Sequence, residues 1–153
     1  MNDPMVPPPA QGLYEPSSSH ADLVYSAGMT ARESGVLQYK GLIGGGVDME
    51  EAKAAARIAS KNAVDAIEAS PEGRRTILRV VQTTVYLACV EGFESHSQVA
   101  DAASEYLRDR LGSQILGARV AIGVSSLPGG SPVEIQLTAT ARTVIGENPR
   151  AGS

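Results

Sequence analysis

Two segments near the end of the chain constrain its fold more than any other feature. From Arg119 to Ser125 and from Val133 to Thr138, apolar residues occupy every second position, which is typical of β-strands with one buried face. Prolines and glycines between the two segments favour a turn, because proline fixes φ and glycine permits a positive φ. The region 117–141 therefore predicts two strands that pair across this turn. We expect Arg119 and Glu134 on their shared face, opposite the apolar side chains.

The composition is that of an ordinary globular domain. The chain has 153 residues, of which 42% are hydrophobic and 20% are charged, and this length suits one domain. Trp is absent and Phe occurs once, so the core must be aliphatic and rich in alanine. The net charge is -4, and no long run of Lys or Arg offers the basic surface that nucleic acids or anionic membranes require. We expect neither as a partner.

Cysteine and histidine are too scarce for a disulfide or for a zinc site made of these residues alone. Cys89 is the single cysteine, and the two histidines lie far apart in the sequence, so a zinc site would need carboxylate ligands. We expect no metal and no other cofactor. No apolar run approaches the ~20 residues that span a bilayer, and the N-terminus lacks a basic region followed by an apolar core. These features predict a cytoplasmic protein.

The remaining segments suggest an α+β domain over residues 13–142, between a Pro-rich flexible arm (1–12) and a polar tail (143–153). Asp48, with Glu51 three residues later, is typical of a capped helix start. The helices are grouped rather than alternating strictly with parallel strands, which favours a mostly antiparallel sheet with two helices on one face. The expected order, β-β-α-β-α-β-β, comprises strands 21–28 and 36–46, helix 48–69, strand 76–90, helix 92–111 and strands 117–125 and 133–141.

Several of these segments resemble the RidA/YjgF family. The resemblance covers roughly residues 14–141, and the closing block is its most specific part. It rests on Leu13-Tyr14, on Ser26-Ala27-Gly28, on the block Val80–Leu87, and on Ala118-Arg119-Val120 followed by Leu127-Pro128 and Val133-Glu134-Ile135.

The resemblance implies a fold, an assembly and a reaction. Similar proteins form a chorismate-mutase-like α+β domain that assembles as a homotrimer, with sites in the clefts between subunits. They hydrolyse reactive 2-imino or enamine acids to 2-keto acids and ammonia. By the same resemblance, Arg119 would hold the substrate carboxylate, Glu134 would orient the attacking water, and the ring of Tyr14 would cover the ligand. Gly28 and Ala121 complete the expected substrate-binding set.

The chemistry of these residues is compatible with that reaction, although other interpretations stay open. A guanidinium binds a carboxylate bidentately, and a nearby carboxylate can act as general base toward water. From the residues alone, Arg119 and Glu134 would instead be interpreted as a structural cross-strand ion pair. Ala27 and Met29 stand where similar proteins usually carry serine and glutamine. The alternative function is therefore a non-catalytic trimer that binds small carboxylates. Ribonuclease activity, sometimes attributed to the family, is disfavoured by the acidic charge.

Overall fold

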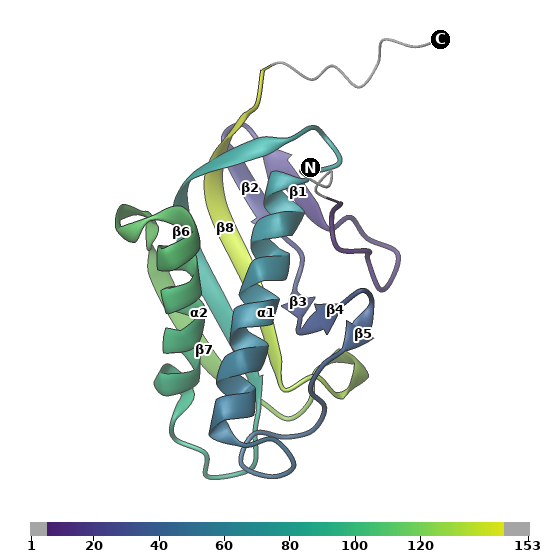
Figure 1. The fold of residues 1–153 in the computed structure, drawn as a ribbon, viewed down its shortest axis with the longest axis vertical. Coiled ribbons are helices and arrows are strands. Elements are labelled where there is room, and N and C mark those ends of the chain that lie inside the picture. The colour runs from purple at the N-terminus through teal and green to yellow at the C-terminus, as the bar shows by residue number, and fades with distance from the viewer. Residues whose placement is uncertain (1–5, 146–153) are drawn as a thin grey trace.

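The computed structural model describes residues 6–145, and in this range the chain forms an α+β fold with one main sheet (Figure 1). The sheet runs in the order β1-β2-β8-β6-β7, and β3 pairs with a further part of β8. Its strands are β1 (Ser17–His20), β2 (Leu23–Ser26), β3 (Met29–Thr30), β6 (Arg75–Ala88), β7 (Ala118–Val124) and β8 (Val133–Thr143), beside a separate pair of β4 (Arg32–Glu33) and β5 (Val36–Leu37).

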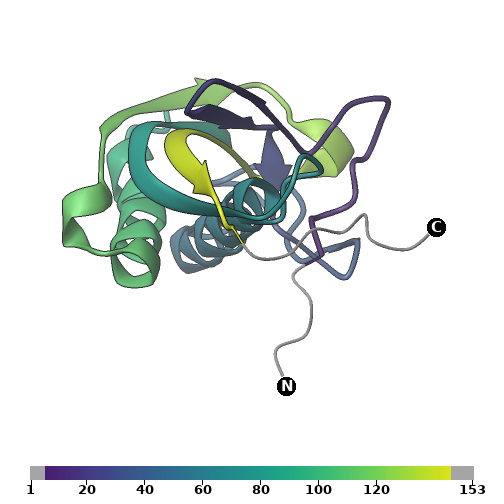
Figure 2. The same cartoon turned by 90° about the horizontal axis from the view of Figure 1, so that it is seen from above.

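Two helices, α1 (Met49–Glu68) and α2 (His96–Leu111), pack side by side on one face of the sheet (Figures 1 and 2). The predicted capping box at the start of α1 is confirmed. The Asp48 carboxylate accepts a hydrogen bond from the backbone N–H of Glu51 at 2.9 Å, and the Glu51 carboxylate accepts one from the backbone N–H of Asp48 at 2.9 Å. The buried face of α1 is made of small side chains, which bring the helix close to the sheet: Ala52, Ala55, Ala56, Ala59, Ala63 and Ala66.

The central strand β6 separates the two strands that the sequence predicted to be paired. It is parallel to β7 and antiparallel to β8, so the prediction that these two strands pair with each other is wrong. The reason lies in the connections. Helix α2 brings the chain back parallel to β6, as in a βαβ unit, and the turn around the short 3-10 helix η2 (Pro128–Gly130) leads across to the other side of β6.

The register of β6 also places Arg119 and Glu134 on opposite faces of the sheet. Tyr86 lies opposite Glu134, whereas Thr83 lies opposite Arg119. Positions of opposite parity on one strand point to opposite faces. Arg119 therefore faces the helix layer and Glu134 faces away from it, so the predicted shared face is wrong.

The first part of the sheet differs from the expected long strands. The expected strand 21–28 is present as the shorter β2, and β1 before it pairs with β2 in a tight hairpin. The expected strand 36–46 shortens to β5, and beyond it Gly41 and Gly44 adopt positive φ values of 124° and 85°, which interrupt an extended strand. Before β5, Ser34 and Gly35 adopt positive φ values of 49° and 80° and turn the chain between β4 and β5. Positive φ at both central positions is the geometry of a type I′ turn.

The ends of the expected domain lie partly outside the described residues. The predicted arm is described from residue 6, and the predicted tail only to residue 145; the domain boundaries stay a prediction. Within the described range, neither helix is long and apolar enough to cross a membrane.

Candidate functional site

Two adjoining cavities lie beside β3, next to α1 and the N-terminal segment that precedes β1. Their volumes are about 650 Å³ and about 290 Å³. Ala27, Pro128 and Glu134 line only the smaller one. The residues that line both are Gln11, Tyr14, Gly28, Thr30 and Arg32.

Glu134 is the carboxyl group of the smaller cavity. It lies on β8, opposite Thr30 of β3, and its side chain is half-buried. Burial raises the pKa of this carboxyl above its usual range. Within residues 6–145, its carboxylate forms no hydrogen bond or ion pair. A carboxyl group that is half-buried, without a protein partner and open to a cavity can accept a proton from a bound water.

Gly28 makes space for this carboxyl group. A Cβ atom at position 28 would overlap Oε1 of Glu134 and would lie 2.7 Å from its Cδ. A residue with a side chain would therefore displace the carboxylate. The absence of a side chain at position 28 thus allows the Glu134 carboxylate to occupy its position, and the substrate-binding role of Gly28 stays a prediction.

Tyr14 forms part of the wall shared by the two cavities. Its side chain is half-exposed, and its hydroxyl accepts a hydrogen bond from the backbone N–H of Gln11 at 3.1 Å. The ring is thereby held next to a cavity that also contains Gly28 and Glu134. The structure thus brings together three of the five predicted site residues.

Arg119 and Ala121 lie elsewhere, on the side of β7 that faces α2. Nη1 of Arg119 donates hydrogen bonds to Oδ1 of Asp101 at 2.8 Å and to Oγ of Ser104 at 3.0 Å. Ala121 is half-buried and packs against the hydrophobic core. Neither residue lines a described cavity. The expected proximity of Arg119 to Glu134 is therefore wrong within a single chain.

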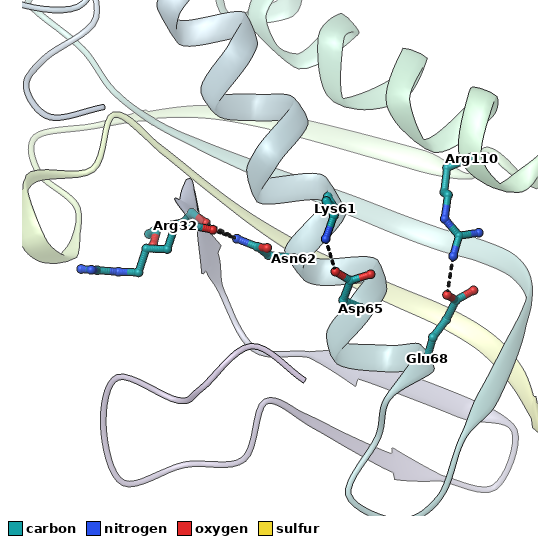
Figure 3. Close-up of polar contacts among 7 residues, drawn as sticks. Arg32, Lys61, Asn62, Asp65, Glu68 and Arg110 are labelled. Carbon is teal, nitrogen blue, oxygen red and sulfur yellow. Dashed lines mark hydrogen bonds and ion pairs between the residues drawn. The ribbon is translucent and has the colours of Figure 1, made fainter. Parts of the chain in front are cut away.

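Arg32 is a cation of the cavities that the sequence did not reveal. Its Nη1 donates a hydrogen bond to the carbonyl of Gly35 at 2.9 Å. The side-chain amide of Asn62 on α1 donates to the carbonyl oxygens of Thr30 at 3.0 Å and of Arg32 at 2.8 Å. Figure 3 shows this contact and the Arg32 side chain extending away from α1. The signal in the sequence that could have identified Asn62 is a polar residue within the alanine-rich face of α1.

Two ion pairs near α1 complete the polar surroundings (Figure 3). Lys61 and Asp65, both in the wall of the larger cavity, are joined at 2.6 Å, and this hydrogen bond raises the pKa of Lys61. Glu68 and Arg110 are joined at 2.7 Å, although burial still raises the pKa of Glu68. Among residues 6–145, no cluster of three His, Cys, Asp or Glu side chains is arranged to hold a metal.

One further pair lies at the opposite edge of the sheet. Sγ of Cys89 lies 3.8 Å from Nε2 of His96, and burial raises the pKa of the thiol. The ring of Phe93 packs edge-on against His96 at 5.1 Å between ring centroids. His96 is half-buried in this packing.

Comparisons with known proteins identify relatives of this chain and of its fold. The model of the family described as endoribonuclease L-PSP matches residues 6–141. Protein TCP17 of Trypanosoma cruzi is 31% identical over 96 residues, which are 62% of this chain and 60% of that protein. The chain thus spans about three fifths of the length of the curated relative it matches.

Solved structures share the fold over most of their length. A protein of unknown function from Agrobacterium tumefaciens has a TM-score of 0.80 at 30% identity, with 85% of this chain and 82% of that chain covered. E. coli TdcF, solved with bound serine, has a TM-score of 0.65 at 16% identity, with 90% and 95% covered. At this lower identity the likeness concerns the fold alone.

Proposed function

The chain belongs to the endoribonuclease L-PSP family, which includes the RidA/YjgF proteins, and from this premise we propose that it hydrolyses reactive 2-imino or enamine acids to 2-keto acids and ammonia. The single observation that supports this reaction most is Glu134, a half-buried carboxyl group without a protein partner among the described residues, in a cavity shared with Tyr14 and Gly28. TdcF, a protein of the same fold, binds serine, which is compatible with a small amino-acid-like ligand.

We further propose that the complete site contains groups from two copies of the chain, arranged as a homotrimer. Arg119 and Glu134 point to opposite faces of one sheet, so one chain cannot direct both at a small substrate. Arg119 from a second copy would bind the substrate carboxylate bidentately. The sheet face that bears Glu134 also exposes Val120 and Ile122 at 39% and 41%, which suits contact with another protein surface.

In the proposed reaction, Glu134 takes a proton from water and then gives the same proton to the nitrogen of the substrate. The carboxylate accepts a proton from water as the water oxygen bonds to the imine carbon, and the C=N π electrons move onto nitrogen. The resulting carbinolamine nitrogen takes up the proton from the Glu134 carboxyl. The hydroxyl proton then moves to the amino nitrogen as the C–N bond breaks and the C=O bond forms, so that the nitrogen leaves as ammonia. The imine carbon is already electrophilic, so positioning and one proton-transferring group suffice.

The test measures keto-acid release from imino acids generated in situ by an amino-acid oxidase. We expect the wild-type protein to release keto acid faster than the uncatalysed reaction, and Arg119→Ala to lose this acceleration. Arg108→Ala is the matched control, because Arg108 is a half-exposed α2 arginine that pairs with its neighbour Asp109. Release at the uncatalysed rate with pure wild-type protein would contradict the enzyme. A monomer in light scattering would contradict the shared site.

A second candidate is a trimer that binds small carboxylates without turnover. It is favoured by Ala27, which lines the smaller cavity where similar proteins carry a hydroxyl group. In that case a small carboxylate would raise the thermal midpoint, since a ligand that binds only the folded state stabilises it. The rise would disappear in Arg119→Ala, and no keto acid would form. The cytoplasmic location stays a prediction from the sequence.

A further inference from the structure

The smaller cavity contains a charged group that the proposed reaction does not use, the guanidinium of Arg32. Its described lining holds two charged side chains, Arg32 and Glu134. The proposed reaction assigns Glu134 to the water, so Arg32 is the charged side chain of this lining that is left for a ligand. A ligand with an anionic group in this cavity would therefore meet one permanent positive charge, on Arg32.

The guanidinium of Arg32 has unused donors. Within residues 6–145 it donates one hydrogen bond, from Nη1 to the carbonyl of Gly35. Its Nε is buried and has no partner, and no carboxylate within residues 6–145 forms an ion pair with it. A buried N–H without an acceptor is costly, and guanidinium has five N–H donors in a planar fork. An incoming carboxylate would supply the missing acceptors.

The surroundings hold this guanidinium in place. The Ser34-Gly35 turn provides its one acceptor, and the amide of Asn62 fixes the backbone on either side of Ala31. Gly129, next to the cavity-lining Pro128, leaves room for the group, because a Cβ at position 129 would lie 2.9 Å from Nη2 of Arg32. A donor held in this way loses little freedom when it binds a ligand.

The other cations considered for the site already have carboxylate partners within the chain. Lys61, in the larger cavity, is joined to Asp65 at 2.6 Å. Arg119 is joined to Asp101 at 2.8 Å. Of these three cations, Arg32 is the one without a carboxylate partner among residues 6–145.

We propose that Arg32 binds a second anionic group of the substrate, so that the site prefers 2-imino acids whose side chain ends in a carboxylate. This inference rests on the proposed function. Arg119 of a second copy holds the carboxylate next to the imine, Glu134 handles the water proton, and Arg32 holds the carboxylate at the other end. The volume of the smaller cavity, about 290 Å³, is at the small end of ligand pockets, about 300–1,000 Å³, as a short diacid requires.

The test compares two imino acids, 2-iminoglutarate made from glutamate and 2-iminopropanoate made from alanine, each generated in situ by an oxidase. We expect wild-type kcat/KM to be at least about tenfold higher for the diacid. Arg32→Gln should lower kcat/KM for the diacid about 10- to 100-fold, chiefly through KM, and leave the monoacid within about twofold. Arg108→Gln removes the same charge from α2 and should change neither. Equal loss for both substrates in Arg32→Gln, or no loss, would overturn the proposal.

A binding measurement separates this proposal from the reaction itself. If wild type turns over neither imino acid, the proposed reaction fails, and the thermal midpoint is then measured with glutarate and with butyrate. A rise with glutarate that is absent in Arg32→Gln but kept in Arg108→Gln supports the role of Arg32. An equal rise in Arg32→Gln, or no rise in wild type, overturns it. If Arg32→Gln does not fold, Arg32→Lys replaces it, because lysine keeps the positive charge but lacks the planar fork that binds a carboxylate bidentately.

Discussion

The two arginines, Arg119 and Arg32, differ in what the chain itself offers them. Arg119 has a carboxylate and a hydroxyl within 3.0 Å, from Asp101 and Ser104 on α2. Arg32 has one backbone carbonyl and a buried Nε without an acceptor. At the edge formed by α2 and β7, Arg119 thus has its hydrogen-bond partners within the chain. The cavity beside β3 contains two groups, Arg32 and Glu134, to which a ligand could supply hydrogen-bond partners. Substitutions at the cavity should therefore affect chemistry, and those in the packing between α2 and β7 away from Arg119, around His96, should affect stability.

The largest effect is expected for Glu134→Gln. If Glu134 moves the proton, its loss should lower kcat about 10²- to 10³-fold, within the usual contribution of a general base. Because the pKa of Glu134 is raised, the wild-type rate should rise with pH through that pKa, as the carboxylate forms. A pH–rate profile of both proteins checks this. A variant that keeps the same rising limb would show that another group is the base.

Gly28→Ala should affect catalysis next most. The new Cβ would overlap Oε1 of Glu134, so the carboxylate must move, and a displacement of this size costs about 10- to 100-fold in kcat/KM. Gly46→Ala is the matched control, since a Cβ there meets nothing within 4 Å and its φ is not positive. The measurement is kcat/KM together with the thermal midpoint. An unchanged kcat/KM in folded Gly28→Ala would exclude a role for the present position of Glu134.

At the α2–β7 edge, Gly123→Ala should show the opposite behaviour. A Cβ at position 123 would lie 2.7 Å from Nε2 of His96 and 3.2 Å from Sγ of Cys89, so the packed His96 must shift. Overpacking of this kind costs about 1–3 kcal/mol. Chemical denaturation should show this loss while kcat/KM stays within about twofold. Comparison with Gly28→Ala tests whether the cavity and the α2–β7 packing act separately. A loss of kcat/KM in Gly123→Ala would mean that the two are coupled.

The sequence predicted where helices and strands form better than it predicted which of them lie next to each other. Asp48 and Glu51 act through contacts within one helical turn, so the start of α1 could be identified from local residues. The alternation of apolar and polar residues likewise identified β7 and β8. This pattern does not show which strand pairs with which, or which face of a strand is buried. Val120 and Ile122, the apolar residues of β7, are in fact 39% and 41% exposed, because α2 covers the opposite side of the strand.

The site was predictable to the extent that its residues belong to recognisable blocks. Tyr14, Gly28 and Glu134 stand in segments that resemble known proteins, and the structure gathers them at one cavity. Arg32 has no such signal. Its place depends on the turn at residues 34–35 and on a distant contact with Asn62 of α1, which no spacing along the chain reveals.

Asp101→Ala tests whether the ion pair of Arg119 with Asp101 in its own chain competes with substrate binding. The pair is exposed on the Asp101 side, at 61%, so its loss should cost less than about 1 kcal/mol of stability. If Arg119 binds substrate in a second copy, removing the competing carboxylate should lower KM about two- to fivefold without changing kcat. Ser104→Ala removes the weaker contact and should have a smaller effect. A raised KM in Asp101→Ala would instead mean that Asp101 holds Arg119 in its working position.

The smallest effect expected is a change in stability with pH at Glu134. Burial raises its pKa in the folded state above the ordinary 4.5, so folding disfavours the charged form. Below 4.5 the group is protonated in both folded and unfolded states and this penalty is absent. As pH rises through the folded pKa, the wild type loses stability relative to Glu134→Gln, and the difference then stays constant. Thermal midpoints of both proteins at about pH 4 and about pH 8 measure this difference. If the stability of the wild type instead rises relative to the variant toward high pH, a cation stabilises the carboxylate, and Arg32 is the candidate in the cavity.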